Sequence, residues 1–268
     1  MRISKTERWS SRFGNSGRPM QDSEFPYFGE HERFRFPPVS ESTPEGIVAS
    51  GGNLSPGMLL SAYSQGIFPW YAEGEPLLWW SPDPRFILWF EDIHISKSLK
   101  KTLRQDRFSV TLDTDFEAVI EACRDVPRRG QTGTWITEEM TEGYIRLHEL
   151  GYAHSVEVRR EGSLAGGLYG VSLGACFFGE SMFSRVSDAS KIALVYLVAQ
   201  LSRVGFDCLD SQVYTAHLQR MGAVEIPREE YMRILEKRLE MPTIRGNWGT
   251  KLPEMKTSNI LALNFDTQ

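Results

Sequence analysis

One stretch, residues 174–221, constrains the fold of this chain more than any other. An apolar run over residues 175–178 predicts a strand, and a longer apolar run over residues 189–204 predicts a helix that ends at Gly205. A second apolar strand is predicted over residues 206–213. A strand, a helix and a strand in this order predict a crossover that lays the two strands parallel in one sheet.

Three polar residues interrupt the apolar pattern of this stretch. Glu180 follows the first strand, and Asp210 and Gln212 lie two residues apart in the second. Because side chains alternate along a strand, Asp210 and Gln212 are predicted to share one face. An acid and an amide among apolar neighbours cost free energy unless they are used or hydrogen-bonded. They are therefore candidate functional residues, and a purely structural hydrogen bond is the alternative.

The composition excludes several classes of protein. The chain has 268 residues, of which 41% are hydrophobic and 24% charged, as is usual for a globular protein. Its net charge of −5 provides no global basic field, so contact with nucleic acid needs a local patch. No apolar run reaches the roughly 18 residues of a membrane span, and we expect neither a membrane partner nor a secretory signal.

Cysteine and histidine usage indicates a reducing compartment and no metal centre. The three cysteines show no CxxC spacing and lie in apolar surroundings, so we expect buried free thiols and a cytoplasmic location. The five histidines form no pair with metal-ligand spacing. We therefore expect no metal and no bound cofactor.

The chain is expected to divide into four parts. Residues 1–36 lack helical or strand periodicity and are predicted to be a flexible extension. Residues 37–92 are predicted to form a small N-terminal domain, and residues 93–245 carry the regular elements. Residues 246–268 lose periodicity and are predicted to be a loose tail.

Aromatic residues dominate the N-terminal domain. Trp70, Trp79 and Trp80 lie among prolines, which favours a rigid aromatic wall over a regular element. Such a wall provides a stacking platform for a nucleic-acid base, and a small aromatic core is the alternative.

Basic residues gather just after this domain. They form a local patch that suits phosphate, with a solvated helix face as the alternative. The patch comprises Lys97, Lys100, Lys101, Arg104 and Arg128.

The order of elements predicts the fold class. From residue 109 the order is a strand, two helices, three strands linked by tight turns, the long helix, a strand and a helix. The class is α+β, with a mostly antiparallel sheet and one parallel crossover pair, and this order is that of GCN5-type N-acyltransferases. Their sheet opens beside the strand that follows the long helix. Glu180, Asp210 and Gln212 are expected near that opening.

A CoA-dependent N-acetyltransferase is the alternative function. Those enzymes hold the pyrophosphate with a glycine-containing loop before the long helix. Residues 182–189, the equivalent stretch, contain no glycine, and this disfavours CoA. Ser184, Arg185 and Lys191 offer side-chain contacts to a phosphate instead. A non-enzymatic RNA-binding module, the other alternative, needs no acid and amide at one cleft.

Eleven short sequence motifs carry a resemblance to a known family. They include GNLSP from Gly52, YSQGIFPWY from Tyr63, LLWWSPDPR from Leu77, GTWIT from Gly133, GESMFSR from Gly179, DSQV from Asp210 and LQRMGAVEIPR from Leu218. With these motifs, over about residues 37–242, the chain resembles the leucyl/phenylalanyl-tRNA–protein transferases. Residues 1–36 lie outside the resemblance.

The resemblance implies an activity. Such an enzyme moves leucine or phenylalanine, and methionine less efficiently, from its tRNA to a protein N-terminus that begins with Arg or Lys. The product is marked for degradation by the N-end rule. No cofactor or metal is implied, because the aminoacyl ester is already activated.

The resemblance also implies roles for single residues. It places Gln212 beside the attacking amine as a catalytic residue with Asp210 in support, and Glu180 in substrate binding. The proton acceptor stays open between Asp210, water and the ribose hydroxyl. Trp70 and Trp135 are implied to contact the terminal adenosine. The implied pocket for the donor side chain, with core packing as the alternative, consists of Leu168, Met182, Leu194 and Leu209.

Overall fold

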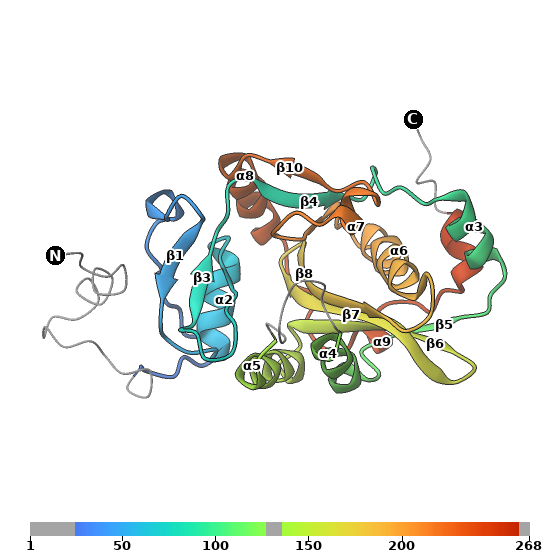
Figure 1. The fold of residues 1–268 in the computed structure, drawn as a ribbon, viewed down its shortest axis with the longest axis horizontal. Helices are drawn as coiled ribbons and strands as arrows, with labels where there is room; N and C mark the ends of the chain where they lie inside the picture. Colours follow the sequence, from blue (N-terminus) through green and yellow to red (C-terminus); the bar gives the residue numbers. More distant parts are fainter. Residues whose placement is uncertain (1–24, 127–135, 263–268) are drawn as a thin grey trace, which may run out of the picture. The chain divides into compact units, whose positions relative to one another are not determined.

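The computed structural model describes residues 25–126 and 136–262. The described residues form two compact units, which divide between Pro82 and Asp83 (Figure 1).

Over residues 25–82, the described part of the first unit, there are a three-stranded antiparallel sheet and one α-helix. Its elements are η2 (Val39–Glu41), β1 (Ile47–Ser50), α2 (Pro56–Ser64), β2 (Phe68–Pro69) and β3 (Leu78–Trp80). The strand order is β1-β3-β2. Trp79 and Trp80 lie in β3, so the expectation of an irregular aromatic wall is wrong for them. The short strands pair with each other, and that pairing cannot be recognised from periodicity within three residues.

Residues 25–36 pack onto the first unit. Phe36 is buried and its ring lies 4.9 Å from that of Trp79. The amide of Phe28 donates to Ser55 Oγ, and the amide of Phe36 donates to Gln65 Oε1. The expected flexible extension, residues 1–36, is therefore wrong for residues 25–36, because Phe36 is buried and hydrogen bonds to Ser55 and Gln65 hold the segment. Residues 1–24 lie outside the described residues.

The second unit is built on a seven-stranded sheet. Its strands are β4 (Arg85–Trp89), β5 (Ser109–Leu112), β6 (Ala153–Arg160), β7 (Ser163–Leu173), β8 (Cys176–Ser184), β9 (Cys208–Asp210) and β10 (Val224–Ile226). The order is β10-β4-β9-β8-β7-β6-β5. Only the pair β8–β9 is parallel among these described strands. The expected α+β class with one parallel crossover pair is confirmed.

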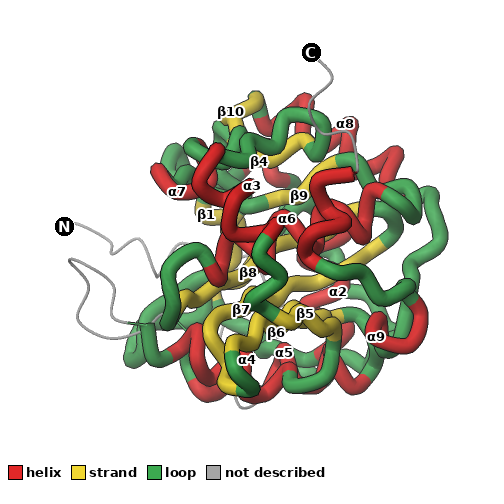
Figure 2. The backbone as a smooth tube through the Cα atoms, turned by 90° about the vertical axis from the view of Figure 1, so that its right-hand side faces the viewer, coloured by secondary structure: helices red, strands yellow, loops and turns green. Residues whose placement is uncertain are grey.

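Helices cover both faces of this sheet (Figures 1 and 2). They are α3 (Lys97–Arg104), α4 (Phe116–Arg124), α5 (Glu138–Glu149), α6 (Ala189–Ser202), α7 (Ala216–Gln219), α8 (Arg228–Leu239), α9 (Trp248–Lys251) and the 3-10 helix η3 (Thr257–Ala262). Helix α6 packs on one face, where Leu168 belongs to its core. The next residue, Tyr169, points to the other face and contacts Phe116 of α4 and Tyr144 of α5.

The expected domain boundary at residue 92 is wrong, because β4 pairs with β9 and β10 in the large sheet. The boundary lies between Pro82 and Asp83. These pairings join residues more than 100 positions apart, which local sequence patterns do not reveal.

The expected loose tail, residues 246–268, is wrong for residues 246–262. Trp248 is fully buried, and its indole stacks on the ring of His154 at 3.6 Å. Ile260 of η3 is also buried in the core. Burial of these two side chains holds the segment, and residues 263–268 lie outside the described residues.

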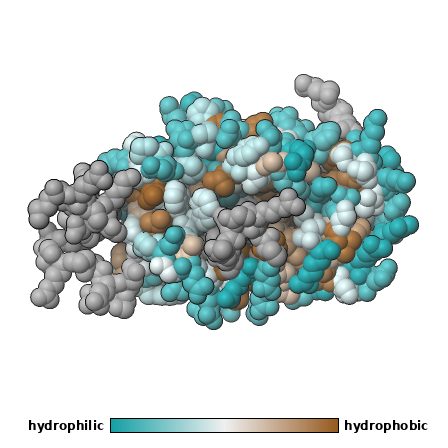
Figure 3. Space-filling model, in the orientation of Figure 1, coloured by the Kyte–Doolittle hydropathy of each residue, from teal (hydrophilic) through white to brown (hydrophobic). Residues whose placement is uncertain are grey.

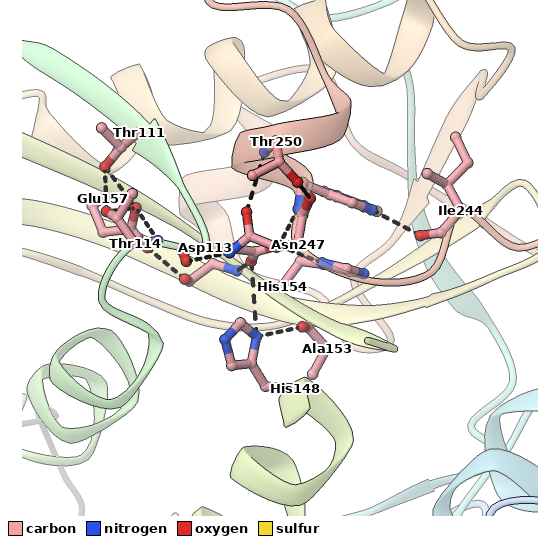
Figure 4. A network of polar contacts seen from close by, with 12 residues as sticks. Thr111, Asp113, Thr114, His148, Ala153, His154, Glu157, Ile244, Asn247 and Thr250 are labelled. Atoms are coloured by element: carbon pink, nitrogen blue, oxygen red, sulfur yellow. Dashed lines mark hydrogen bonds and ion pairs between the residues drawn. The ribbon is translucent and has the colours of Figure 1, made fainter. Parts of the chain in front are cut away.

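A polar network ties this C-terminal segment to the end of β5 (Figure 4). The Asp113 carboxylate accepts hydrogen bonds from His154 Nδ1 at 2.8 Å, from the Ser155 amide at 2.8 Å and from the Trp248 amide at 2.7 Å. The Asn247 side chain donates to the Asp113 carbonyl oxygen at 3.0 Å. The segment is therefore held by hydrogen bonds as well as by apolar contacts.

Hydrophilic residues predominate on the face shown in Figure 3. Among the described residues, the exposed large hydrophobic side chains are Tyr27, Val204, Tyr214, Val224 and Met241. No described helix is both long and apolar enough to cross a bilayer.

Candidate functional site

The parallel strands β8 and β9 part at one point, and the candidate residues lie there. Their pairing ends at Phe178 and Asp210. Strand β8 continues along β7, where Gly179 and Ser181 face consecutive residues of β7 and Glu180 is the extra residue of a β-bulge. A bulge re-aims a side chain without ending the strand. The expected strand, residues 175–178, is therefore too short, and Glu180 lies within β8.

Strand β9 ends at Asp210, so the expected strand over residues 206–213 is too long. Gln212 follows in a turn with a φ of 59°. Its amide donates to Asp210 Oδ1 at 2.9 Å, a local hydrogen bond that competes with a continued strand. A non-glycine residue in this conformation costs about 1–3 kcal/mol and persists only where its surroundings enforce it. The two residues are joined by this bond rather than by a shared strand face.

Asp210 is held by an arginine and a tyrosine. Arg85 Nε lies 2.9 Å from Asp210 Oδ1, and Arg85 Nη2 lies 2.6 Å from Oδ2. The Tyr231 hydroxyl donates to Oδ2 at 2.7 Å. The side chains of Arg85 and Asp210 are 0% and 1% exposed, so water does not screen the pair.

The ionisation of this cluster follows from its burial. Burial alone lowers the pKa of Arg85, but the charge of Asp210 and its hydrogen bond raise that pKa above the ordinary value. Burial raises the pKa of Tyr231 well above its ordinary value. Arg85 is therefore a permanent cation and Tyr231 a neutral hydrogen-bond donor. The guanidinium also lies 4.5 Å above the Tyr231 ring, which favours a cation.

Glu180 joins Gln212 to helix α5. Gln212 Nε2 donates to Glu180 Oε1 at 3.3 Å, and the Tyr144 hydroxyl donates to Oε2 at 2.7 Å. An ionised carboxylate only accepts hydrogen bonds, so the amide nitrogen of Gln212 must face it. The amide oxygen of Gln212 is then the atom available to accept a hydrogen bond from an amine. The structure thus brings together the three polar residues that the sequence singled out.

Arg85, Tyr144 and Tyr231 complete this group and were not predicted from the sequence. The sequence did contain a signal for Arg85. This charged residue ends the family motif LLWWSPDPR and directly precedes the apolar run FILWF. Tyr144 and Tyr231 lie in ordinary amphipathic helices, where a buried tyrosine indicates only core packing.

The apolar candidates lie in the core beneath α6. Leu168, Leu194 and Leu209 are buried members of that core. Met182 is partly buried against it and faces Leu168 across the β7–β8 ladder. Met182 is therefore the one residue of the four that combines core contact with partial exposure.

Ser184 and Arg185 lie at the exposed end of β8. Ser184 Oγ donates to the Val186 carbonyl at 2.8 Å and accepts the Ser190 amide at 3.4 Å, which organises the start of α6. Arg185 contacts the Leu164 carbonyl and the Phe183 ring. Lys191 forms an ion pair with Asp188 at 2.7 Å. Arg185 is exposed, so its guanidinium lies at the surface.

The basic candidates of α3 lie opposite its apolar face. Leu99 and Leu103 are buried, whereas Lys97, Lys101 and Arg104 are exposed. Lys100 is partly buried, and Arg128 and Trp135 lie outside the described residues.

Trp70 belongs to the first unit and is half-buried. Its ring lies 5.6 Å from that of Trp80, whose Nε1 donates to the Trp70 carbonyl at 2.6 Å. These contacts hold Trp70 in place within its unit. Over the described ranges, no group of three His, Cys, Asp or Glu side chains could hold a metal ion.

Comparisons with known proteins agree on one family. The profile "Leucyl/phenylalanyl-tRNA protein transferase" matches residues 87–236, and the profile of the N-terminal domain of the same transferases matches residues 52–83. The leucyl/phenylalanyl-tRNA–protein transferase of Syntrophus aciditrophicus is 59% identical over 215 residues, which cover 80% of this chain and 90% of that protein. That of Myxococcus xanthus is 54% identical over 213 residues, which cover 80% and 91%.

Among solved structures, L-PGS from Bacillus licheniformis is similar with a TM-score of 0.37 and 10% identity, covering 59% of this chain and 64% of that one.

Proposed function

Because this chain belongs to the leucyl/phenylalanyl-tRNA–protein transferase family, we propose that it moves leucine or phenylalanine, and methionine less efficiently, to protein N-termini that begin with Arg or Lys. Membership in the family makes it an aminoacyl-tRNA–protein transferase, which acts on aminoacyl-tRNA and on a protein N-terminus. Its product enters N-end rule degradation. The buried free thiols of Cys123, Cys176 and Cys208 support a cytoplasmic location.

The observation that carries the proposal is the hydrogen-bonded group of Glu180, Gln212 and Asp210 where β8 and β9 part. In the reaction, the acceptor's α-amine attacks the ester carbonyl of the aminoacyl-tRNA. A carbon–nitrogen bond forms, the ester carbon–oxygen bond breaks, and the ribose hydroxyl leaves with a proton while the amine loses one. The amine has an ordinary pKa of about 7.7–8.0, so a useful fraction is neutral at cellular pH.

Gln212 orients that amine. Its amide oxygen accepts a hydrogen bond from the amine and aims the nitrogen lone pair at the ester. An amide has no basic site at neutral pH, so Gln212 positions the nucleophile and takes no proton. Glu180 lies beside it and is partly exposed, so its carboxylate attracts the cationic Arg or Lys side chain of the acceptor.

The donor needs contacts for its base, side chain and phosphates. The terminal adenosine stacks on Trp70 and Trp135, and stacking of a base on an aromatic ring contributes about 1–3 kcal/mol. Met182 borders the pocket for the donor side chain, where a flexible thioether accommodates both leucine and phenylalanine. Leu168, Leu194 and Leu209 shape that pocket from the core behind it.

The phosphates of the tRNA meet two basic surfaces. Arg185 contacts a phosphate near the 3′ end, and the neighbouring Ser184 holds the start of α6 in place through its hydrogen bonds to Val186 and Ser190. The exposed basic face of α3 contacts the tRNA backbone further away, without reading the base sequence. No nucleotide, metal or other cofactor takes part, because the ester itself is the activated group.

An aminoacyl-transfer assay tests the proposal. We expect labelled leucine to pass from leucyl-tRNA to a peptide that begins with Arg, and not to the same peptide with a blocked amine. A matched peptide that begins with Ser measures the contribution of the cationic side chain. Transfer from acetyl-CoA, with none from leucyl-tRNA, would instead identify a CoA-dependent N-acetyltransferase.

A further inference from the structure

The turn that carries Gln212 is held by two consecutive residues of β4. The Phe86 amide donates to the Gln212 carbonyl at 3.2 Å, and the Ser211 amide donates to the Phe86 carbonyl at 3.0 Å. Arg85, the preceding residue, binds the Asp210 carboxylate through two hydrogen bonds. Strand β4 therefore holds the turn by backbone hydrogen bonds from Phe86 and by side-chain hydrogen bonds from Arg85.

The Asp210 carboxylate is fully occupied. Oδ1 accepts Arg85 Nε and the Gln212 amide, and Oδ2 accepts Arg85 Nη2 and the Tyr231 hydroxyl. An ionised carboxylate offers about four acceptor positions, and four donors fill them here. All four contacts are buried. A proton or a cationic substrate group can reach Asp210 only after one of these bonds is broken.

We infer that Arg85 is a positioning residue, which acts through Asp210 and the turn to aim the Gln212 amide at the attacking amine. Asp210 then links Arg85 to the Gln212 amide and so fixes the conformation of the turn. It neither takes the proton of the attacking amine nor binds the positive charge of the acceptor peptide. Tyr231 has the same role from α8, through its bond to Oδ2. The proton of the amine leaves to the ribose oxygen or to water. This inference rests on the proposed function of Gln212.

The chemistry of arginine explains why lysine cannot replace it here. The guanidinium presents Nε and Nη2 side by side, which matches the two carboxylate oxygens, whereas an ammonium group is a single point donor. Arg85→Lys keeps the buried positive charge but loses the paired geometry. The turn should then lose its fixed orientation while the charge balance of the cluster is kept.

A double-mutant cycle with Gln212→Ala tests the inference. The kcat and KM for leucine transfer to an Arg-starting peptide are measured for the wild type, Arg85→Lys, Gln212→Ala and the double variant. Leucyl-tRNA affinity is measured in parallel by filter binding. Arg85→Lys should lower kcat by about 10-fold in the wild-type background and by less than about 2-fold beside Gln212→Ala, with little change in leucyl-tRNA affinity.

Arg238→Lys is the matched control. Arg238 binds both carboxylate oxygens of Asp207, three residues before Asp210, but this pair is partly exposed and does not contact the turn. Its substitution should leave kcat unchanged. If Arg85→Lys does not fold, Tyr231→Phe provides a second double-mutant cycle with Gln212→Ala. Its control is Tyr196→Phe, which removes a buried tyrosine hydroxyl from α6 instead of α8.

The outcomes separate the inference from the function on which it rests. An unchanged kcat in Arg85→Lys and Tyr231→Phe overturns the inference. So does an equal loss of kcat with and without Gln212, because the effect then does not pass through that residue. If Gln212→Ala itself transfers leucine at the wild-type rate, the proposed role of Gln212 fails and the inference fails with it.

Discussion

Replacement of Asp113 should destabilise this protein strongly. Its carboxylate is buried and accepts hydrogen bonds from the His154 ring, the Ser155 amide and the Trp248 amide (Figure 4). Trp248 begins the segment that closes over the core, so the bond to its amide joins chain segments 135 residues apart. Asp113→Ala removes the acceptor and leaves three buried donors.

The magnitude follows from those donors. Each buried group left without its hydrogen bond costs about 1–3 kcal/mol, and relaxation or entry of water recovers part of the sum. Asp113 also has a φ of 54°, a conformation that aspartate and asparagine adopt more readily than alanine. We expect Asp113→Ala to lower the free energy of unfolding by about 3–5 kcal/mol, at the upper end for a single substitution.

Asp113→Asn separates the contribution of the carboxylate hydrogen bonds from that of the left-handed backbone conformation. It keeps a side chain that tolerates the left-handed conformation and retains one acceptor oxygen, but it replaces the second oxygen with a donor. Its cost should be about half that of the alanine variant, because one of the two acceptor atoms is kept.

Urea unfolding followed by fluorescence measures both variants, and Asp106→Ala is the matched control. Asp106 also has a positive φ and also binds the C-terminal segment, through Thr257 and Ser258, but it is exposed. Water can replace its hydrogen bonds, so its loss should cost clearly less. The reasoning is refuted if Asp113→Ala costs no more than Asp106→Ala.

Four further predictions concern turnover, pH, tRNA binding and donor choice. Asp210→Ala and Gln212→Ala should each lower kcat by about 10–100-fold and combine non-additively, because both act on one turn; steady-state kinetics that show additive losses, or normal turnover in Gln212→Ala, contradict this. Burial lowers the pKa of His154 despite the bond from its ring to Asp113, so the unfolded state binds a proton more readily. Stability should therefore be complete above about pH 6.5 and fall as pH decreases below it, by at most about 1.4 kcal/mol per unit, and urea titrations should show a shallower dependence in His154→Gln. Replacement of the exposed cations of α3, which are Lys97, Lys101 and Arg104, should weaken the binding of leucyl-tRNA and phenylalanyl-tRNA alike and flatten the salt dependence of the affinity. An unchanged salt dependence would show that this helix face does not bind tRNA. Leucyl-tRNA and phenylalanyl-tRNA should be used well and valyl-tRNA poorly in transfer assays, because branching at Cβ meets the wall of an apolar pocket; equal use of valine would contradict a pocket that selects by shape.

Local sequence patterns determined most of the helices and the central strands. The long helix was predicted over residues 189–204, and it is observed as α6 over Ala189–Ser202, with the same start and an earlier end. The crossover from β8 through α6 to β9 was predicted from apolar runs and glycines alone. These features depend on neighbours within a few residues, so periodicity and capping report them directly.

The ends of the strands at the site were not predictable in this way. Strand β8 continues past Glu180 because a bulge keeps it paired with β7, and β9 stops at Asp210 because that side chain captures the Gln212 amide. A run of polar residues predicts the end of a strand equally well in both cases. Only the partner strand and the hydrogen bond distinguish them.

The sequence by itself determined the order of elements, the family and the three polar residues that the structure brings together. Only the tertiary structure decided that Arg85, 125 residues before Asp210, binds its carboxylate, and that β4 belongs to the large sheet. It alone decided that Trp248 closes the core through Asp113. Such contacts join segments whose own patterns carry no information about each other, because the free energy that selects them arises only when the chain is folded and water is excluded between them.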